Sequence, residues 1–380
     1  MRTTDVAGEG DRDGRRWRSH RLVSLVAALA IAVAIASLTN FAVGAHATLS
    51  DVAWHDFGST GQVDCLFVGS SYAQRAFDPT VFDAETGTHS VNLSTPGQVM
   101  GDTYDAVSTA ISEKGTRHVV LGLGIVSFYD SGDVWSHVPY VMARDDRHPV
   151  ACTRAMLEIA LNPRVIGTAK SVNVLFPWTF TPVKSIPGIL ANMRAKVTGE
   201  AYSSAAEKTT PGWHYVGQGY GNYGDPIDRS NGMTTLSAYG NPHVDEQCLA
   251  NLVRVCDLCR ERGVRLTVVA TPHPAYDLLA IGNAYPEIMS RVQSVAEEHG
   301  ATYWDLSMVD GGELDLGMDD FGDYEHLNLD GARKATGCLA RLIAEQDAGG
   351  DVDRHFIPYG EWDRWVEQAK ASDTGKGGGR

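Results

Sequence analysis

The chain has 380 residues, of which 43% are hydrophobic and 21% are charged, a balance typical of a globular protein with one large domain or two modest ones. Its net charge is −15. Residues 1–21 hold six arginines against four acids, or +2, so the remainder carries −15 − 2 = −17. Such an acidic chain argues against nucleic acid as a partner.

The amino terminus contains an uncharged apolar run from Leu22 to Ala45, which is long enough to cross a bilayer as one helix. Arginines precede it, from Arg12 to Arg21, so the positive-inside rule keeps residues 1–21 in the cytoplasm and sends the chain after residue 45 outside. A cleaved signal peptide is the alternative, because residues 45–47 read Ala-His-Ala, a cleavage-site pattern. The long run favours a retained signal anchor over residues 22–45, and hence a single-pass protein of the cell membrane.

Past this anchor, short β-rich runs alternate with helical patterns, which indicates a doubly wound α/β domain with a parallel sheet. We expect the domain to occupy residues 46–347, followed by a C-terminal extension, 348–380, with a disordered tail from Ala371. The runs expected as strands are 63–69, 89–94, 117–124, 264–270 and 301–307. The expected helices are 98–114, 244–262, 285–299 and 331–346, the last capped by Asp330.

The segment at about 130–242 does not follow this alternation. It holds two helical pieces, 149–170 and 186–196, and a Gly- and Tyr-rich stretch at 215–225. We interpret it as one long insertion. An insertion at the ligand end of a sheet often forms a lid or a docking surface, and a plain additional subdomain is the alternative.

The six cysteines favour packing over metal binding. Cys248, Cys256 and Cys259 fall on one helical stripe with Leu252 and Val255, so the C-x-x-C spacing at 256–259 indicates a core face and not a redox or zinc motif. No second C-x-x-C or H-x-x-x-H supports a metal. One disulfide, involving Cys152, is left open by the sequence.

The stretch CLFVGSSYAQRAFDP, residues 65–79, reads as a buried strand that stops at Gly69 and delivers Ser70 and Ser71 to its carboxyl end. Ligands bind outside the carboxyl ends of strands in parallel α/β sheets, so these hydroxyls stand where chemistry is expected. The alternative is that either serine only caps a helix running through 72–77.

Near the carboxyl terminus, Asp323 and His326 lie three residues apart just before the last expected helix. A serine hydroxyl becomes a nucleophile when a histidine takes its proton, and a carboxylate fixes the tautomer of that histidine. A D-x-x-H turn supplies both groups from one loop. A loop of solvated acids with a surface histidine is the alternative for this short motif.

A strand-Gly-x-Ser at the start of a domain, paired with Asp-x-x-His before its last helix, resembles the SGNH (GDSL-type) hydrolase superfamily over roughly residues 60–130 and 262–345. The resemblance implies a flavodoxin-like three-layer α/β/α fold. It makes Ser71 the nucleophile, His326 the general base and then acid, and Asp323 the residue that orients His326. It also implies an oxyanion hole built from the backbone amides of Ser71 and Gly97, with no metal and no cofactor.

The third motif of that family, Gly-x-Asn-Asp, is absent, because the corresponding stretch at 121–130 reads LGLGIVSFYD and contains no asparagine. A backbone amide or Ser127 would have to replace that donor. An anchor, an exported domain and a degenerate third motif are together similar to membrane-anchored SGNH proteins that accompany MBOAT acyltransferases, including DltD-like and alginate O-acetylation proteins.

This resemblance implies a serine esterase or O-acyltransferase that acts on an acylated cell-envelope polymer or a small ester, with an MBOAT-type membrane acyltransferase as partner. The alternative is a non-catalytic scaffold, whose SGNH fold binds the polymer or the MBOAT partner. An intact serine, aspartate and histidine in the family order favour the enzyme, whereas the missing third motif favours the scaffold.

Overall fold

The computed structural model describes residues 9–129, 134–200, 202–228, 230, 241–310 and 312–376. The chain forms two compact units: residues 1–46 with 145–200, and residues 47–144 with 201–380. We call them the anchor unit and the sheet unit. The stretch expected as one insertion, 130–242, is divided between them, because residues 201–242 belong to the sheet unit.

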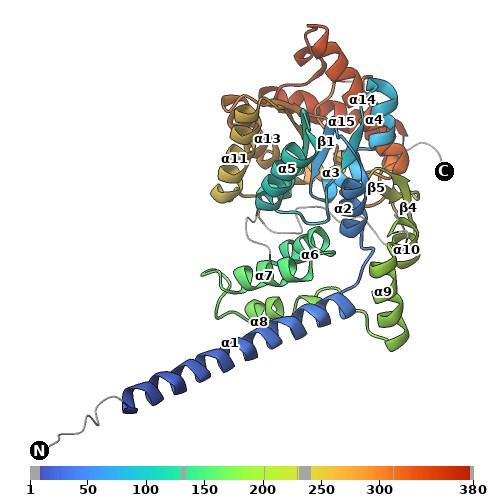
Figure 1. Ribbon diagram of the computed structural model, residues 1–380. Helices are drawn as coiled ribbons and strands as arrows, with labels where there is room; N and C mark the ends of the chain where they lie inside the picture. The colour runs from blue at the N-terminus through green and yellow to red at the C-terminus, as the bar shows by residue number, and fades with distance from the viewer. Residues whose placement is uncertain are drawn as a thin grey trace, which may run out of the picture. The chain divides into compact units, whose positions relative to one another are not determined.

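The sheet unit is built on five parallel strands, which confirms the predicted fold class (Figure 1). All five predicted runs form strands, and their order in the sheet is β2-β1-β3-β6-β7, the flavodoxin-like order. They are almost continuously apolar because both faces of the sheet are covered. The strands are β1 (Cys65–Gly69), β2 (Ser90–Asn92), β3 (His118–Leu123), β6 (Arg265–Ala270) and β7 (Thr302–Asp305).

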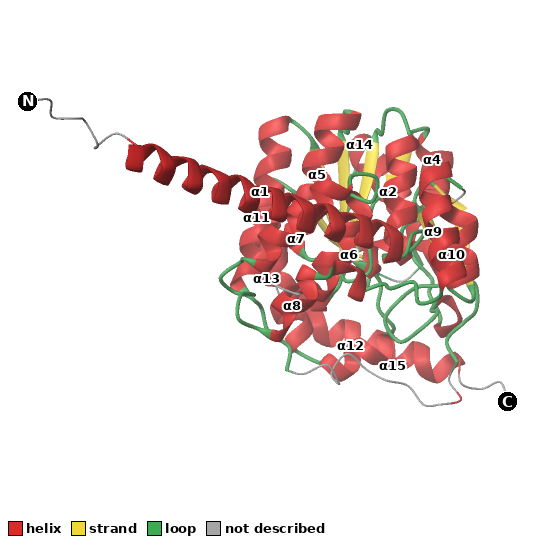
Figure 2. Ribbon diagram, turned by 60° about the horizontal axis from the view of Figure 1, so that its bottom comes forward, coloured by secondary structure: helices red, strands yellow, loops and turns green. Residues whose placement is uncertain are grey.

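Helices flank the sheet, and Figure 2 shows the strands enclosed among them. One group consists of α5 (Met100–Lys114), α11 (Glu246–Arg262) and α13 (Ala284–Glu298); the other consists of α3 (Ser71–Ala76), α4 (Pro79–Thr86) and α14 (Leu329–Asp347). Alternate strand residues such as Phe67, Val120 and Trp304 share a buried core with Leu339 of α14. The four helices expected beside the strands are therefore present.

The cap predicted for the last helix was wrong by two residues. Helix α14 begins at Leu329, and its N-cap is Asn328, whose side chain accepts the amides of Asp330 and Gly331. Asparagine and aspartate cap equally well, and α14 simply begins earlier than its apolar pattern indicated.

The rest of the sheet unit surrounds this core. It contains α2 (Leu49–Ser59), α6 (Val134–Arg144), α10 (Tyr202–Thr209), α12 (Ala275–Ile281), α15 (Trp362–Lys376) and an antiparallel hairpin of β4 (Trp213–Gly217) and β5 (Tyr220–Tyr223). The Gly- and Tyr-rich stretch thus supplies most of a hairpin. Helix α15 continues to Lys376 into the tail expected to be disordered, and residues 377–380 lie outside the described range.

The anchor unit consists of α1 (Glu9–Val43), α7 (Pro149–Ala160), α8 (Ala169–Leu175) and α9 (Ile186–Thr198). Within α1, Trp17–Val43 is long and apolar enough to cross a membrane, which is consistent with a signal anchor or a signal peptide. The helical piece expected at 149–170 is interrupted, because α7 ends at Ala160 and the next helix, α8, begins at Ala169, whereas the piece expected at 186–196 forms α9.

All six cysteines are free and buried, so the disulfide left open for Cys152 does not form. The sulfur of Cys152 accepts a hydrogen bond from the Asn40 amide at 3.3 Å. Burial raises the pKa of Cys256 and of Cys259 to about 12, as expected for thiols on the packed face of α11.

Candidate active site

The turn between β1 and α3 depends on Gly69. Its φ is +144°, and a Cβ there would lie 2.3 Å from the carbonyl oxygen of Gly122 on neighbouring β3. Side chains do not tolerate that distance from backbone, so only glycine lets β1 turn this sharply. Ser71 follows as the first residue of α3, just beyond the carboxyl end of β1.

Ser70 occupies the N-cap position of α3, but its hydroxyl makes no cap hydrogen bond. Its Oγ is buried and has no partner among the described residues. The alternative in which this serine is present as a helix cap is therefore wrong for the side chain, although Ser70 does precede the helix.

The second part of the site is the loop before α14. The Asp323 carboxylate accepts the backbone amides of Glu325 at 3.0 Å and His326 at 2.8 Å, and the Gly322 amide donates to the His326 carbonyl. This local turn fixes the D-x-x-H spacing, so the carboxylate lies beside the imidazole ring. Asn328 then caps α14 and ends the loop.

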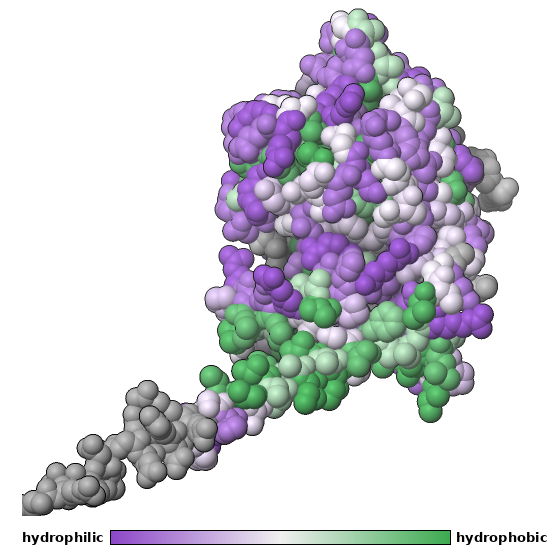
Figure 3. Space-filling view, viewed as in Figure 1, coloured by the Kyte–Doolittle hydropathy of each residue, from purple (hydrophilic) through white to green (hydrophobic). Residues whose placement is uncertain are grey.

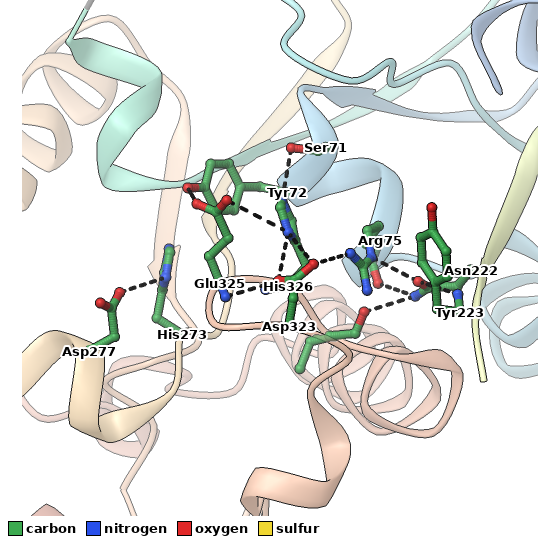
Figure 4. A network of polar contacts seen from close by, with 11 residues as sticks. Ser71, Tyr72, Arg75, Asn222, Tyr223, His273, Asp277, Asp323, Glu325 and His326 are labelled. Atoms are coloured by element: carbon green, nitrogen blue, oxygen red, sulfur yellow. Dashed lines mark hydrogen bonds and ion pairs between the residues drawn. The ribbon is translucent and has the colours of Figure 1, made fainter. Parts of the chain in front are cut away.

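The structure brings Ser71, His326 and Asp323 together in one chain of hydrogen bonds (Figure 4). His326 Nε2 lies 2.9 Å from Ser71 Oγ, and His326 Nδ1 lies 2.9 Å from Asp323 Oδ1. With Nδ1 protonated toward Asp323, Nε2 is left to accept the Ser71 proton. This is the arrangement that activates a serine hydroxyl.

Arg75 completes the environment of Asp323, and the sequence analysis missed it. Its Nη1 donates to Asp323 Oδ2 at 2.5 Å, its Nε donates to Asn222 Oδ1 at 2.9 Å, and its guanidinium lies 4.7 Å from the Tyr223 ring centroid. Burial alone would raise the pKa of Asp323, but the hydrogen bond from His326 and the charges of His326 and Arg75 hold it well below the usual range.

One signal could have identified Arg75. It stands four residues after Ser71 in the same short helix, so both side chains project from one face. Asn222 gives no such signal, because it comes from the β4–β5 hairpin, 147 residues away.

Tyr72 and Glu325 support the imidazole from the side. The Tyr72 hydroxyl donates to Glu325 Oε2 at 2.6 Å, and the Tyr72 ring centroid is 5.1 Å from that of His326. Burial and the neighbouring Glu325 carboxylate raise the pKa of Tyr72 well above its usual range, so the phenol stays protonated and remains a donor.

A second histidine–aspartate pair lies on the other side of Tyr72. His273 follows β6 and is buried, with its ring centroid 5.2 Å from that of Tyr72 and its Nδ1 3.7 Å from Asp277 Oδ2. The hydrogen bonds of Figure 4 link this pair to neither Ser71 nor Asp323. The pair therefore packs against the site from the β6 side of the sheet.

Gly97 lies in the loop after β2, the strand that pairs with β1. Its φ of +67° suits glycine, and the Thr95 amide in the same loop donates to the Gly69 carbonyl at 3.3 Å. The loop is thereby held to the end of β1, at the same edge as Ser71. No backbone carbonyl among the described residues accepts the amide of Ser71 or of Gly97.

The stretch in place of the third motif forms β3 and a short 3-10 turn, Ile125–Phe128. Ser127 Oγ accepts the Gly124 amide at 3.1 Å, so this hydroxyl fixes the turn. Asp130 lies outside the described residues. Across the described part of the chain, no group of three or more histidine, cysteine or acidic side chains is placed to hold a metal ion.

Comparison with known proteins gives no family model that matches this chain and no curated protein that matches its sequence. The structure itself defines the class: an α/β protein with a five-stranded parallel sheet flanked by helices, preceded by an apolar N-terminal helix.

Proposed function

We propose that this protein is a membrane-anchored, extracytoplasmic serine esterase or O-acyltransferase with an SGNH-type domain. The observation that carries the proposal is the hydrogen-bonded chain from Ser71 through His326 to Asp323 at the carboxyl edge of the sheet. The flavodoxin-like strand order and the sequence order, serine first and Asp-x-x-His last, support the SGNH type.

In the first half of the reaction, Ser71 Oγ attacks the carbonyl carbon of an ester while His326 Nε2 takes its proton. The amides of Ser71 and Gly97 hydrogen-bond the oxyanion of the tetrahedral intermediate. The intermediate collapses to an acyl-serine, and the leaving alcohol departs with the proton from His326. Asp323 remains ionised and stabilises the imidazolium.

In the second half, an acceptor oxygen attacks the acyl-serine with His326 again as base. Water as acceptor gives hydrolysis, and a sugar hydroxyl gives O-acyl transfer. Regeneration of Ser71 completes the cycle without metal or cofactor. An acylated cell-envelope polymer is the substrate class that follows from the resemblance, with an MBOAT-type acyltransferase as the membrane partner.

We further propose that α1 is retained as a signal anchor. Cleavage after Ala47 would remove the part of α1 that packs in the anchor unit. There, Ser37 Oγ lies 2.7 Å from Thr153 Oγ1, and the Asn192 amide donates to the carbonyls of Ala42 and Gly44, both at 2.9 Å. A signal peptide destined for removal has no need of such partners.

The second candidate is a non-catalytic scaffold that binds the polymer or the MBOAT partner. The observation that favours it is the absence of the Gly-x-Asn-Asp asparagine; Ser127 in this stretch accepts the Gly124 amide within its own turn. The two candidates differ in whether Ser71 reacts.

The test is labelling of the purified full-length protein with a fluorophosphonate probe, followed by peptide mapping and by turnover of p-nitrophenyl acetate. We expect an adduct on Ser71 that is lost in Ser71→Ala and His326→Ala. Each variant should lose on the order of 10³-fold or more in activity, and the double variant should lose no more, because the residues act as a unit.

Ser70→Ala is the matched control, since Ser70 is adjacent and its hydroxyl has no described partner; it should keep most of the activity. The enzyme proposal fails if the wild-type protein forms no adduct on Ser71 and does not turn over the ester, while Ser71→Ala still restores polymer acylation in cells lacking the gene. The scaffold proposal then takes its place.

A further inference from the structure

Helix α9 carries an exposed apolar stripe. Ile186, Leu190, Met193 and Val197 recur at intervals of four, three and four residues, which places them on one helical face, and their side chains are 36–77% exposed. In a globular domain such a stripe faces the core. Here the buried positions of α9 are instead Asn192 and Ala195, which lie on the other side of the helix.

The neighbouring helices repeat this pattern. On α7, Val150 and Leu157, with Leu161 just beyond its end, form an exposed stripe, while Cys152 and Met156 face inward. On and just after α8, the exposed large apolar residues are Val172, Leu175 and Phe176. Contiguous apolar surface of this kind marks a binding surface, since monomeric soluble proteins rarely expose it.

These stripes are continuous with the apolar surface of α1. Figure 3 shows hydrophobic residues gathered along α1 and the helices beside it. Side chains on one face of α1 near its end, Ser37 and Asn40, bond to Thr153 and Cys152 of α7. Asn192 of α9 bonds to the carbonyls of Ala42 and Gly44. Helices α7 and α9 are thus attached to the C-terminal end of α1, and α8 packs on α7.

The charge of this segment differs from that of the chain. Residues 145–200 contain seven arginines and lysines and four acids, or +3, so the rest of the chain carries −15 − 3 = −18. Arg164, Lys170 and Lys184 are exposed, and Phe176 and Trp178 lie between them in sequence. Apolar stripes flanked by cations and aromatic rings are the composition of helices that lie at an anionic membrane surface.

We infer that α7, α8 and α9 lie in the interface of the bilayer that α1 crosses, with their apolar stripes at the boundary of headgroups and acyl chains and their cations on anionic phospholipid. The anchor unit would then be held by four helices instead of one. The inference rests on retention of α1, and it does not depend on the reactivity of Ser71.

The native cysteines make a direct test feasible, because all six are buried and an introduced exposed cysteine is labelled selectively. Leu190→Cys and Val172→Cys report on α9 and α8. Leu29→Cys in α1 is the positive control, and Glu261→Cys, exposed on α11 of the sheet unit, is the matched aqueous control. Each full-length variant carries an environment-sensitive fluorophore in nanodiscs of equal parts phosphatidylglycerol and phosphatidylcholine. A ratio of one label per chain shows that the variant is folded, because the six native cysteines then remain buried and do not react.

The measurement is quenching by lipids that carry a doxyl group close to the headgroup. The labels on Leu190→Cys and Val172→Cys should lose most of their fluorescence, whereas the fluorescence of the label on Glu261→Cys should not change. If both behave like Glu261 while Leu29 is quenched by a doxyl group deep in the chain, the lipid inference is overturned and the stripes are left for a protein partner.

Two further outcomes are decisive. If the label on Leu29→Cys is not quenched either, α1 does not span the bilayer, and both the signal anchor and this inference fail. The fluorophosphonate test of Ser71 is a separate experiment, so its result is not affected by this failure. In phosphatidylcholine alone, quenching at Leu190 and Val172 should weaken. Unchanged quenching there would overturn the assignment to anionic lipid.

Discussion

Asp323 is shared between two hydrogen-bond partners in the site. Its Oδ1 faces His326 and its Oδ2 faces Arg75, which is itself held by Asn222. Gly322 precedes it and leaves room for the guanidinium, since a Cβ there would lie 2.5 Å from Arg75 Nη2. Arg75 is therefore a positioning residue: it fixes the carboxylate that fixes the histidine, and the hydrogen bonds of its guanidinium to described residues go to Asp323 and Asn222, not to Ser71.

The substitution Arg75→Met should lower kcat by about ten-fold, or about 1.4 kcal/mol of activation free energy, while KM changes little, because the carboxylate loses a fixed partner but no substrate contact is removed. Arg75→Lys should recover part of the loss, since it restores the charge without the planar fork. Steady-state ester hydrolysis separates kcat from KM.

Arg333→Met, on the exposed side of α14, is the matched control and should leave both constants unchanged. An Arg75→Met variant with wild-type kcat would show that Asp323 needs no second partner.

At the scale of elements, the position of Ser71 depends on the close contact between Gly69 at the end of β1 and Gly122 on β3. Gly69→Ala should destabilise the sheet unit by about 3 kcal/mol or more, because its Cβ meets the Gly122 carbonyl and its φ is unfavourable for alanine. Urea unfolding followed by tryptophan fluorescence measures the loss. Labelling of Ser71 should fall even in the folded fraction, since the turn that presents it must shift.

Gly87→Ala is the matched control, since Gly87 has φ +71° at the end of α4 but open space around it. It should cost only about 1 kcal/mol, the price of a left-handed alanine. Equal losses in the two variants would mean that backbone conformation, and not the contact with β3, makes Gly69 necessary.

The elements that could be predicted are those with a local signal. Five buried strands read as apolar runs, and Asp323 with His326 lies in a turn whose own hydrogen bonds set the spacing. Asn222 could not be predicted, because its partner Arg75 is brought to it only by the tertiary packing of the β4–β5 hairpin on α3. The division of the insertion between two units also depends on tertiary packing, because α7 and α9 bond to residues of α1 that are far away in the sequence.

At the scale of the whole molecule, the stability of the sheet unit should depend on His118. This residue begins β3, and its Nε2 lies 2.9 Å from Thr267 Oγ1. Burial, with a smaller effect from the Arg265 charge, lowers the pKa of His118 from 6.5 to about 4, although Asp347 opposes the shift. Between these values the unfolded chain binds a proton that the folded chain does not.

Stability should therefore fall as the pH drops from 6.5 toward 4, and His118 should account for about 2 kcal/mol of the loss by pH 5. His118→Gln cannot titrate, so its unfolding free energy should change less between pH 7 and pH 5. Urea unfolding at the two pH values measures the difference. His214→Gln, at an exposed position of β4, should behave as the wild type does. Identical pH dependence in His118→Gln and the wild type would exclude His118 as the cause.

The arginines before Leu22 and the apolar helix after them predict that the sheet unit lies outside the cell membrane. A membrane-impermeant maleimide added to intact cells should label Glu261→Cys in the sheet unit and should label Ser19→Cys only after the membrane is permeabilised.

Retention of α1 adds a second expectation: the mature protein should keep its amino-terminal segment, which intact-mass measurement detects. The buried native cysteines give the low background. Labelling of Ser19→Cys in intact cells would invert the topology, and a mature chain that begins near Thr48 would show that the helix is a signal peptide.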